Sequence, residues 1–246
     1  MTRAADREGD SMNASSRIPV ELVVLDMAGT TVRDDGVVER AFQRAQERTG
    51  VVAGLTPDEA LQYVRDTMGQ SKLEVFTHLA GGDRARAEEA TAAFERAYAE
   101  LIVEEGVEPV PGARELLVDL RDAGVAVILT TGFAPVTRDA ILDALGWRDL
   151  VDDALSPVDA GRGRPAPDLV LLAALRARVS SVAAIAVAGD TASDIGSGLS
   201  AGAGLVVGVL SGAHDRATLE AAGAHAVIDD VTGLRALIGL QTPAEV

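Results

Sequence analysis

One carboxylate follows directly on a short apolar run near the start of the chain. Residues 22–25 are all aliphatic, Asp26 comes next, and a turn-permissive segment with Gly29 follows. An aliphatic run that ends in Asp and a glycine turn predicts a buried parallel strand, which brings Asp26 to the carboxyl edge of a sheet. Open α/β sheets bind their ligands at that edge. Strands also end in Asp for turn chemistry, so the interpretation depends on partners elsewhere.

Two further carboxylates stand four residues apart in the segment Gly-Asp-Thr-Ala-Ser-Asp at 189–194. They are Asp190 and Asp194, which come after the apolar run 183–188 and at the start of a helical pattern. Two carboxylates at a strand end share a hard cation such as Mg²⁺, and water completes its octahedron. Helix capping by Asp and Ser explains one of these residues, but not both carboxylates.

Two other segments carry groups that hold phosphate. Thr131 and Gly132 close the apolar run 125–131, where a hydroxyl and backbone N–H groups bind a phosphate oxygen. Arg164 stands in a glycine- and proline-rich loop just before a predicted helix, and its guanidinium can clamp an oxyanion with two hydrogen bonds. An ordinary strand-to-helix turn and a solvated loop arginine are the alternative interpretations of these two segments.

The elements that must position these residues alternate along most of the chain. Strand-like apolar runs lie at 22–26, 125–131, 183–188, 205–210 and 226–228. Helical patterns follow each of them, which is typical of βαβ units and of a parallel sheet in an α/β fold. Residues 39–105 break this alternation, because they contain helical patterns at 40–48, 57–66 and 83–105 and no convincing strand. We therefore predict an α/β core at 18–37 and 107–246, with an all-helical cap domain inserted at 38–106.

The composition excludes several classes of function. The 246 residues carry a formal net charge of −16, which argues against nucleic acid and anionic membranes as partners. The chain has no cysteine, so disulfides and thiol catalysis are excluded, and we expect a cytoplasmic location. No apolar run approaches the length of a membrane span. Residues 1–17 lack the apolar core of a signal peptide, so we expect a disordered leader, with Met12 as an alternative start.

The four segments, taken in this order, resemble the haloacid dehalogenase superfamily of phosphotransferases, from about residue 21 to the end. The resemblance implies a doubly wound parallel sheet of the Rossmann-like kind, with Asp26 as the nucleophile that forms an aspartyl-phosphate. It also implies Mg²⁺ as cofactor, held by Asp26, the Ala28 carbonyl and Asp190, with Asp194 in support. A carboxylate is a competent nucleophile once cations neutralise its repulsion by phosphoryl oxygens. The phosphoryl group would be bound by Thr131, Gly132 and Arg164.

Two departures from the superfamily pattern narrow this resemblance. Most phosphatases of the superfamily carry a second Asp two residues after the nucleophile, which protonates the leaving alkoxide, and here that residue is Ala28. Arg164 replaces the usual lysine before the last motif. Both changes, together with the string Asp-Met-Ala-Gly-Thr-Thr at 26–31, resemble the phosphonatase branch, phosphonoacetaldehyde hydrolase and its relatives. In that family a lysine of the helical cap forms a Schiff base with the substrate aldehyde.

Lys72 stands at the matching place, in Met-Gly-Gln-Ser-Lys at 68–72. It is the only lysine among the 22 lysine and arginine residues. A guanidinium does not readily form an imine, so a retained primary amine suggests that imine formation is its role, although composition drift is the alternative explanation. The lysine must lose its proton near neutral pH, and burial beside Met68 under a closed cap favours that loss. Met68 is accordingly predicted to contact the substrate.

Two residues differ from the phosphonatase pattern. Val75 stands where the family has His, and Phe133 stands where it has Tyr. His78 lies one helical turn further along and offers a replacement imidazole, although a lone histidine near an apolar face is more often structural. Members of the family form dimers through their caps, so the resemblance also implies a homodimer.

Three functions follow from these observations. The first is hydrolysis of a phosphonate C–P bond through Asp26 and Lys72, with phosphonoacetaldehyde or a relative as the substrate. The second is a phosphomonoesterase of the same fold that acts on a small phosphorylated metabolite, which Ala28 disfavours because an alkoxide would leave unprotonated. The third is a non-catalytic binding or regulatory protein on the same scaffold. It is disfavoured by the joint presence of five predicted site residues, which are Asp26, Thr131, Arg164, Asp190 and Asp194.

Overall fold

A six-stranded parallel sheet forms the centre of the computed structural model, which describes residues 19–240. The predicted leader at 1–17 lies outside the described residues. The strands are β1 (Leu22–Asp26), β2 (Ala126–Thr130), β3 (Asp153–Leu155), β4 (Ile185–Gly189), β5 (Leu205–Val209) and β6 (Ala226–Ile228). Their order across the sheet is β3-β2-β1-β4-β5-β6, and all neighbours pair in parallel. This doubly wound order confirms the predicted α/β fold.

The central strand β1 is buried on both faces. Leu22 and Val24 belong to the apolar cluster on one side of the sheet, and Val23 and Leu25 belong to the cluster on the other side. A strand covered on both faces is apolar at every position, which is why the continuous run was recognisable in the sequence. The strand β3 has only three residues and was not predicted, because so short a run carries no pattern of its own.

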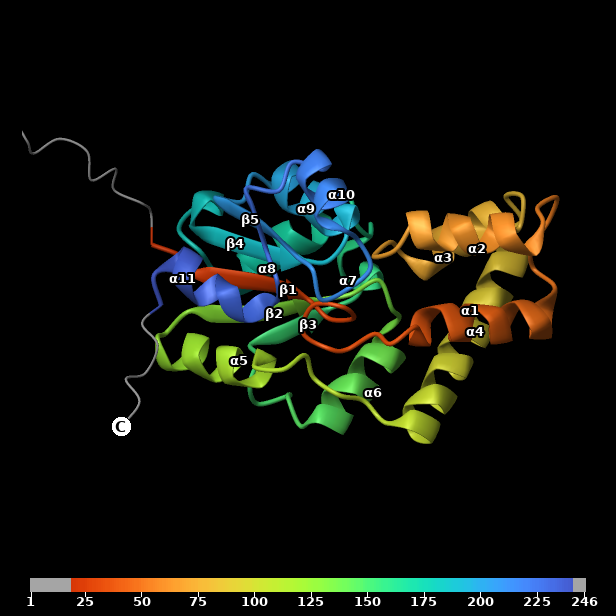
Figure 1. Cartoon of the computed structure of the whole chain (residues 1–246), viewed down its shortest axis with the longest axis horizontal. Helices are drawn as coiled ribbons and strands as arrows, with labels where there is room; N and C mark the ends of the chain where they lie inside the picture. The colour runs from red at the N-terminus through yellow and green to blue at the C-terminus, as the bar shows by residue number, and fades with distance from the viewer. Residues whose placement is uncertain (1–18, 241–246) are drawn as a thin grey trace, which may run out of the picture.

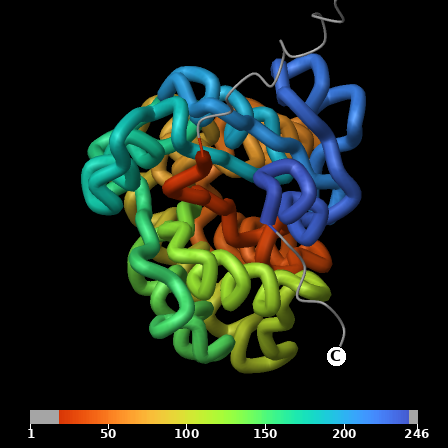
Figure 2. The backbone as a smooth tube through the Cα atoms, turned by 90° about the vertical axis from the view of Figure 1, so that its left-hand side faces the viewer, coloured from red at the N-terminus to blue at the C-terminus, as the bar shows by residue number. Residues whose placement is uncertain are grey.

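Helices cover both faces of the sheet. They are α5 (Ala113–Asp122), α6 (Pro135–Leu145), α7 (Pro157–Ala160), α8 (Asp168–Ala177), α9 (Ala192–Ala201), α10 (Arg216–Ala221) and α11 (Leu234–Ile238), with 3₁₀ turns η1 (Val182–Ala184) and η2 (Val231–Gly233). Helices α8, α9 and α10 pack on one face, and α5 and α11 pack on the other (Figure 1). The end view shows red β1 between the cyan segments and the yellow-green α5 (Figure 2).

Four helices lie together at one side of the sheet (Figure 1). They are α1 (Val37–Thr49), α2 (Pro57–Asp66), α3 (Lys72–Leu79) and α4 (Arg84–Glu105). The long helix α4 packs against both α1 and α3, and aromatic rings of all three meet in their shared core. Residues 38–106 contain no strand, as expected, and the exact domain boundaries stay a prediction. Within residues 19–240, no helix combines the length and the hydrophobicity that a membrane span requires.

Candidate active site

The predicted site residues of the core meet where the strand order reverses. Asp26 is the last residue of β1, Asp190 directly follows β4, and Thr131 directly follows β2. These three strands are neighbours and run in the same direction, so their carboxyl ends share one edge of the sheet. A crevice forms at such a switch point in open α/β sheets. The strand-end motifs are therefore brought together by the topology of the sheet.

Three buried carboxylates share this crevice. Oxygen atoms of Asp26, Asp190 and Asp194 all lie within 4.8 Å of one another. The Thr30 hydroxyl donates to Oδ1 of Asp190 at 3.2 Å, and the Ala213 N–H donates to Oδ2 at 2.7 Å. Two loops therefore hold Asp190, one after β1 and one after β5. Neither loop was identified from the sequence as a support for this carboxylate.

Asp194 has a structural role in addition to its place in the crevice. Its Oδ2 accepts hydrogen bonds from the Thr191 N–H at 3.1 Å and from the Thr191 hydroxyl at 2.5 Å, which forms a capping box at the start of α9. The two alternative interpretations of this residue are thus compatible, because one carboxylate oxygen caps the helix and the other faces the site. The Thr-x-x-Asp spacing was the signal that identifies the cap.

Two glycines allow the backbone to enclose Asp190. A Cβ atom on Gly29 would lie 2.4 Å from Oδ2 of Asp190, and one on Gly212 would lie 2.1 Å from the same atom. Gly29 also has a φ of +88°, a conformation that residues with a side chain rarely adopt. Glycine is therefore required at both positions by the close approach of the carboxylate.

Arg164 lies inside the site and is not a solvated loop residue. Its side chain is 3% exposed, and Nη1 donates to Oδ1 of Asp26 at 2.5 Å and to Oδ1 of Asp194. Its buried Nε has no hydrogen-bond partner among residues 19–240, so a donor remains for an added oxyanion. The structure thus brings Arg164 beside Asp26 and Asp194, and its role in phosphate binding stays a prediction.

The charges in this crevice do not balance. Three carboxylates face a single guanidinium, and all four groups are buried. Burial raises the pKa of Asp26 to about 7, with Arg164 opposing the rise and Asp194 adding to it. Burial also raises the pKa of Asp190 well above its usual value, and the nearby negative charges of Asp26 and Asp194 add to this rise. An excess of buried negative charge with carboxylate oxygens on three sides fits a hard divalent cation such as Mg²⁺.

The loop before α3 lies directly on the core beside this crevice. A Cβ atom on Gly132 would lie 2.4 Å from the Gln70 carbonyl oxygen, and one on Gly69 would lie 2.5 Å from Oγ1 of Thr191. The backbone N–H of Lys72 donates to the Gly132 carbonyl at 3.4 Å. These close approaches place the Met-Gly-x-x-Lys segment against the loops that follow β2 and β4.

Lys72 is the first residue of α3, and its side chain points into the site. The residue is 8% exposed, and Nζ lies 5.6 Å from the ring centroid of Phe94 and 5.5 Å from that of Phe133. Burial lowers its pKa from the usual 10.5 to about 8, although nearby Asp34 opposes this shift. Lys72 lines one cavity of about 30 Å³, together with Asp26, Ala28, Met68, Thr131, Gly132, Arg164 and Asp190.

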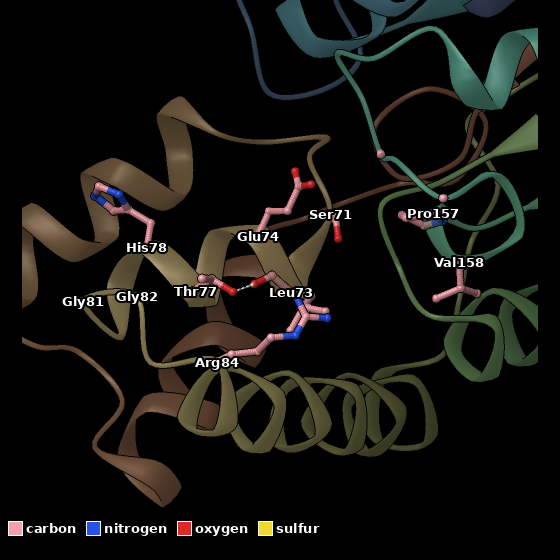
Figure 3. A pocket seen from close by; sticks show the side chains of 12 residues that line it. Ser71, Leu73, Glu74, Thr77, His78, Gly81, Gly82, Arg84, Pro157 and Val158 are labelled. Atoms are coloured by element: carbon pink, nitrogen blue, oxygen red, sulfur yellow. Dashed lines mark hydrogen bonds between the residues drawn. The ribbon is translucent and has the colours of Figure 1, made fainter.

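The structure places His78 outside this cavity. Its exposed imidazole stacks on Tyr63, with 4.1 Å between the ring centroids. It lines a separate groove of about 750 Å³ with Ser71 and Glu74, between α3 and the start of α7 at Pro157 (Figure 3). Val75 is buried among apolar side chains. The imidazole that the phosphonatase pattern places at position 75 is therefore not replaced by His78.

Asp34 is a cavity residue that the sequence did not single out. It lines the 30 Å³ cavity and also a wider groove of about 680 Å³ beside His214. Burial raises the pKa of its carboxyl group, with the Val38 N–H and Lys72 opposing the rise. No motif marks Asp34, because its position depends on the path of the loop between β1 and α1.

Comparison with known proteins identifies the family. The model of the haloacid dehalogenase-like hydrolases matches residues 20–202. The chain belongs to this hydrolase family. Phosphonoacetaldehyde hydrolase of Bacillus cytotoxicus is 28% identical over 220 residues, which cover 80% of this chain and 78% of that protein. The match to phosphonoacetaldehyde hydrolase of Parabacteroides distasonis, also 28% identical, spans 53% of this chain and only 58% of that protein.

Solved structures of the family share the fold. A phosphonoacetaldehyde hydrolase-like protein from Oleispira antarctica superposes with a TM-score of 0.76 at 26% identity, over 94% of this chain and 96% of the other. The family assignment agrees with the doubly wound sheet and with the buried acidic crevice at its switch point. The finer question of which bond this hydrolase cleaves depends on the residues of the site.

Proposed function

We propose that this haloacid dehalogenase-like hydrolase cleaves the C–P bond of phosphonoacetaldehyde or a closely related phosphonate. The observation that carries the proposal is the position of Lys72, the only lysine of the chain, which lines the same small cavity as Asp26. The names of the similar curated proteins support the same substrate class. A buried amine with a lowered pKa is suited to attack a carbonyl carbon, because the unprotonated amine is the nucleophile.

In the proposed reaction Lys72 first activates the substrate. The Nζ amine attacks the aldehyde carbon, water leaves, and a protonated imine joins the substrate to the enzyme. The imine then serves as an electron sink for the adjacent C–P bond. When that bond breaks, its electron pair moves to carbon and gives an enamine. Protonation of the enamine carbon and hydrolysis of the imine release acetaldehyde and restore Lys72.

The phosphoryl group passes to Asp26 in the same step. A carboxylate oxygen of Asp26 forms the new bond to phosphorus as the C–P bond breaks, and water later hydrolyses the aspartyl-phosphate to inorganic phosphate. Arg164 and the Thr131–Gly132 segment would hold the phosphoryl oxygens. Asp26, the Ala28 carbonyl, Asp190 and Asp194 would hold Mg²⁺, which when bound neutralises charge on the phosphoryl oxygens and the carboxylates.

Ala28 favours C–P cleavage over ester cleavage. It lines the cavity beside Asp26, where its methyl group has no proton to give to a leaving alkoxide. The enamine that leaves in C–P cleavage needs no acid at this position, because the protonated imine takes up the electron pair of the broken bond. The phosphomonoesterase alternative is therefore the weaker proposal. We also propose that residues 38–106 form a cap domain, that the protein is a homodimer and that it is cytoplasmic.

The deciding experiment combines product release with covalent trapping. Phosphate release is measured with phosphonoacetaldehyde and with a panel of phosphomonoesters, in the presence of Mg²⁺. Borohydride added during turnover of phosphonoacetaldehyde should inactivate the enzyme and add an ethyl or phosphonoethyl group to the peptide that contains Lys72. Lys72→Arg keeps the positive charge but should lose both activity and trapping. Near-normal hydrolysis of phosphonoacetaldehyde by Lys72→Arg would refute the Schiff-base mechanism.

A further inference from the structure

Glu95 is a buried carboxylate of helix α4 that contacts the start of helix α6. Its side chain lies among the buried residues at 7% exposure. Oε1 accepts a hydrogen bond from the Ala134 N–H at 3.1 Å, and Oε2 accepts one from the Thr137 hydroxyl. Residues 95 and 134 are far apart in the sequence. The contact therefore joins α4, and with it the helices α1–α4, to α6, which follows strand β2 of the sheet.

The contact supplies what α6 lacks at its N-terminus. The residue at the N-cap is Ala134, which has no side chain that can accept a hydrogen bond, and the first turn of α6 contains no acidic residue. A carboxylate is favoured there, since it accepts free donors and interacts well with the positive end of the helix dipole. In a capping box, the side chain of the third helical residue accepts a hydrogen bond from the backbone N–H of the N-cap residue. Glu95 accepts this hydrogen bond from Ala134, although it belongs to another helix.

The same face of α4 also holds the residue that precedes Ala134. The ring centroid of Phe133 lies 4.6 Å from that of Tyr98 and 6.2 Å from that of Phe94. Phe94 and Tyr98 are one helical turn apart on α4, and Glu95 lies between them. One helix face thus contacts the backbone and the side chain of the segment that follows Thr131 and Gly132. Two of those rings, Phe94 and Phe133, flank the Nζ atom of Lys72.

The site must open for a substrate to enter. The cavity has a volume of about 30 Å³, which is room for about two waters. Four of its charged residues, Asp26, Lys72, Arg164 and Asp190, are at least nine-tenths buried, and the fifth, Asp34, is partly exposed. Its walls come both from the helical segment with Met68, Gly69 and Lys72 and from the strand-end loops of the sheet. Contacts between these two parts therefore decide how much of the time Lys72 is enclosed.

We propose that Glu95 is a positioning residue, whose bonds to Ala134 and Thr137 hold helices α1–α4 against α6 and keep Lys72 enclosed beside Asp26. The role holds for whichever reaction the site catalyses. Removal of the carboxylate leaves two donors at the start of α6 without their acceptor and releases one of the contacts that oppose opening. The enclosed state then becomes less populated, and Lys72 becomes accessible to reagents in solution.

The single lysine of the chain makes this opening directly measurable. Reductive methylation with formaldehyde and cyanoborohydride modifies primary amines, so Lys72 is the only side chain that reacts. The rate at which the Lys72 peptide gains mass is compared in wild-type protein, Glu95→Ala, Glu95→Gln and Thr137→Val. The matched control is Glu89→Gln, which changes an exposed glutamate of the same helix.

Glu95→Ala removes a helix cap, so the site should open more often. We expect methylation of Lys72 to be about five- to tenfold faster in this variant. Glu95→Gln keeps an amide oxygen as acceptor and should lie between Glu95→Ala and wild type. Thr137→Val removes one of the two donors and should also accelerate methylation, while Glu89→Gln should leave the rate unchanged. Hydrogen exchange of the β1 and β4 amides is followed in parallel and should change little, because the sheet is not part of the contact.

Two results would overturn the proposal. One is a wild-type rate of Lys72 methylation in Glu95→Gln and in Thr137→Val, which tests the contact even where Glu95→Ala does not fold. The other is an equal acceleration of Lys72 methylation and of β-strand exchange, because a residue that only stabilises the whole fold raises both by the same factor.

Discussion

Lys72 Nζ lies 5.5 Å from the ring centroid of Phe133, so the only lysine of the chain contacts the residue that directly follows Thr131 and Gly132. Lys72 belongs to α3 and Phe133 to the loop between β2 and α6. An aromatic ring attracts a cation but does not solvate it as water does, so the ring partly offsets the loss of hydration. Burial outweighs this attraction, so the amine loses its proton more readily than an exposed lysine.

The first prediction concerns the protonation of Lys72. Burial lowers its pKa to about 8, so about a tenth of the amine is unprotonated at pH 7, against well under a thousandth for an ordinary lysine. Protein labelled with ¹³C-lysine gives one set of lysine signals, because the chain has one lysine. Its side-chain shift should titrate with a midpoint near 8. A midpoint above 10 would show that the amine is solvated and not prepared for imine formation.

A second prediction is that Lys72→Met stabilises the protein and removes imine trapping. The pKa in the folded state is lower than in the unfolded state, so the unfolded state binds more protons between pH 8 and 10.5 and stability rises with pH in that window. Below pH 8 the full penalty of about 3 kcal/mol is present. Methionine has a similar length and no charge, so thermal unfolding at pH 7 should occur at a higher temperature. The gain should shrink as the pH approaches 10.5, and an equal gain at both pH values would contradict the assignment.

Metal removal tests the acidic crevice. Mg²⁺ should raise the unfolding temperature of the wild-type protein, because it neutralises buried carboxylates only in the folded state. Asp26→Asn should abolish phosphate release, since no nucleophile remains. Asp190→Asn should lower both the activity and the thermal shift with Mg²⁺, because Asp26 still holds the ion in part. Asp122→Asn, at an exposed position on α5, serves as the control. Undiminished turnover in EDTA would rule out the metal assignment.

The residue at position 28 distinguishes ester from C–P cleavage. Ala28→Asp adds a carboxylate beside the phosphoryl site, so hydrolysis of phosphonoacetaldehyde should fall through repulsion and crowding. General acid catalysis typically contributes about 10²–10⁴-fold, so the same change should leave hydrolysis of unactivated phosphomonoesters unharmed or raise it. Both activities are measured on one preparation of the variant. If wild-type protein hydrolyses sugar phosphates faster than any phosphonate, and Ala28→Asp lowers both activities alike, the phosphomonoesterase proposal replaces ours.

Much of the fold was predictable, since its determinants are local. The strands β1, β2, β4, β5 and β6 are apolar runs, and the helices α1, α2 and α4 carry extended patterns, so all of these were expected close to where they lie. The short elements were not, because the three residues of β3 and the eight of α3 are too few to show a period. Lys72 itself was found through its motif, although the helix that it begins was not.

By itself the sequence determined which groups stand at the strand ends. An aliphatic run followed by Asp26, and a second one followed by Asp190, place both carboxylates at one edge of a parallel sheet whatever the details of packing. The absence of a second acid at Ala28 and the single lysine at 72 are likewise facts of sequence. They narrow the chemistry because side-chain type alone decides whether a residue can give a proton or form an imine.

Only the tertiary structure decided how these groups are solvated and what encloses them. The lowered pKa of Lys72 arises from the burial of its amine. The rings beside that amine belong to Phe94 and Phe133, which are distant from Lys72 in the sequence. The exclusion of His78 from the cavity and the bonds of Glu95 to α6 depend on how α3 and α4 pack against the core. Burial and contacts between distant residues are properties of the packed chain, so no local pattern in the sequence encodes them.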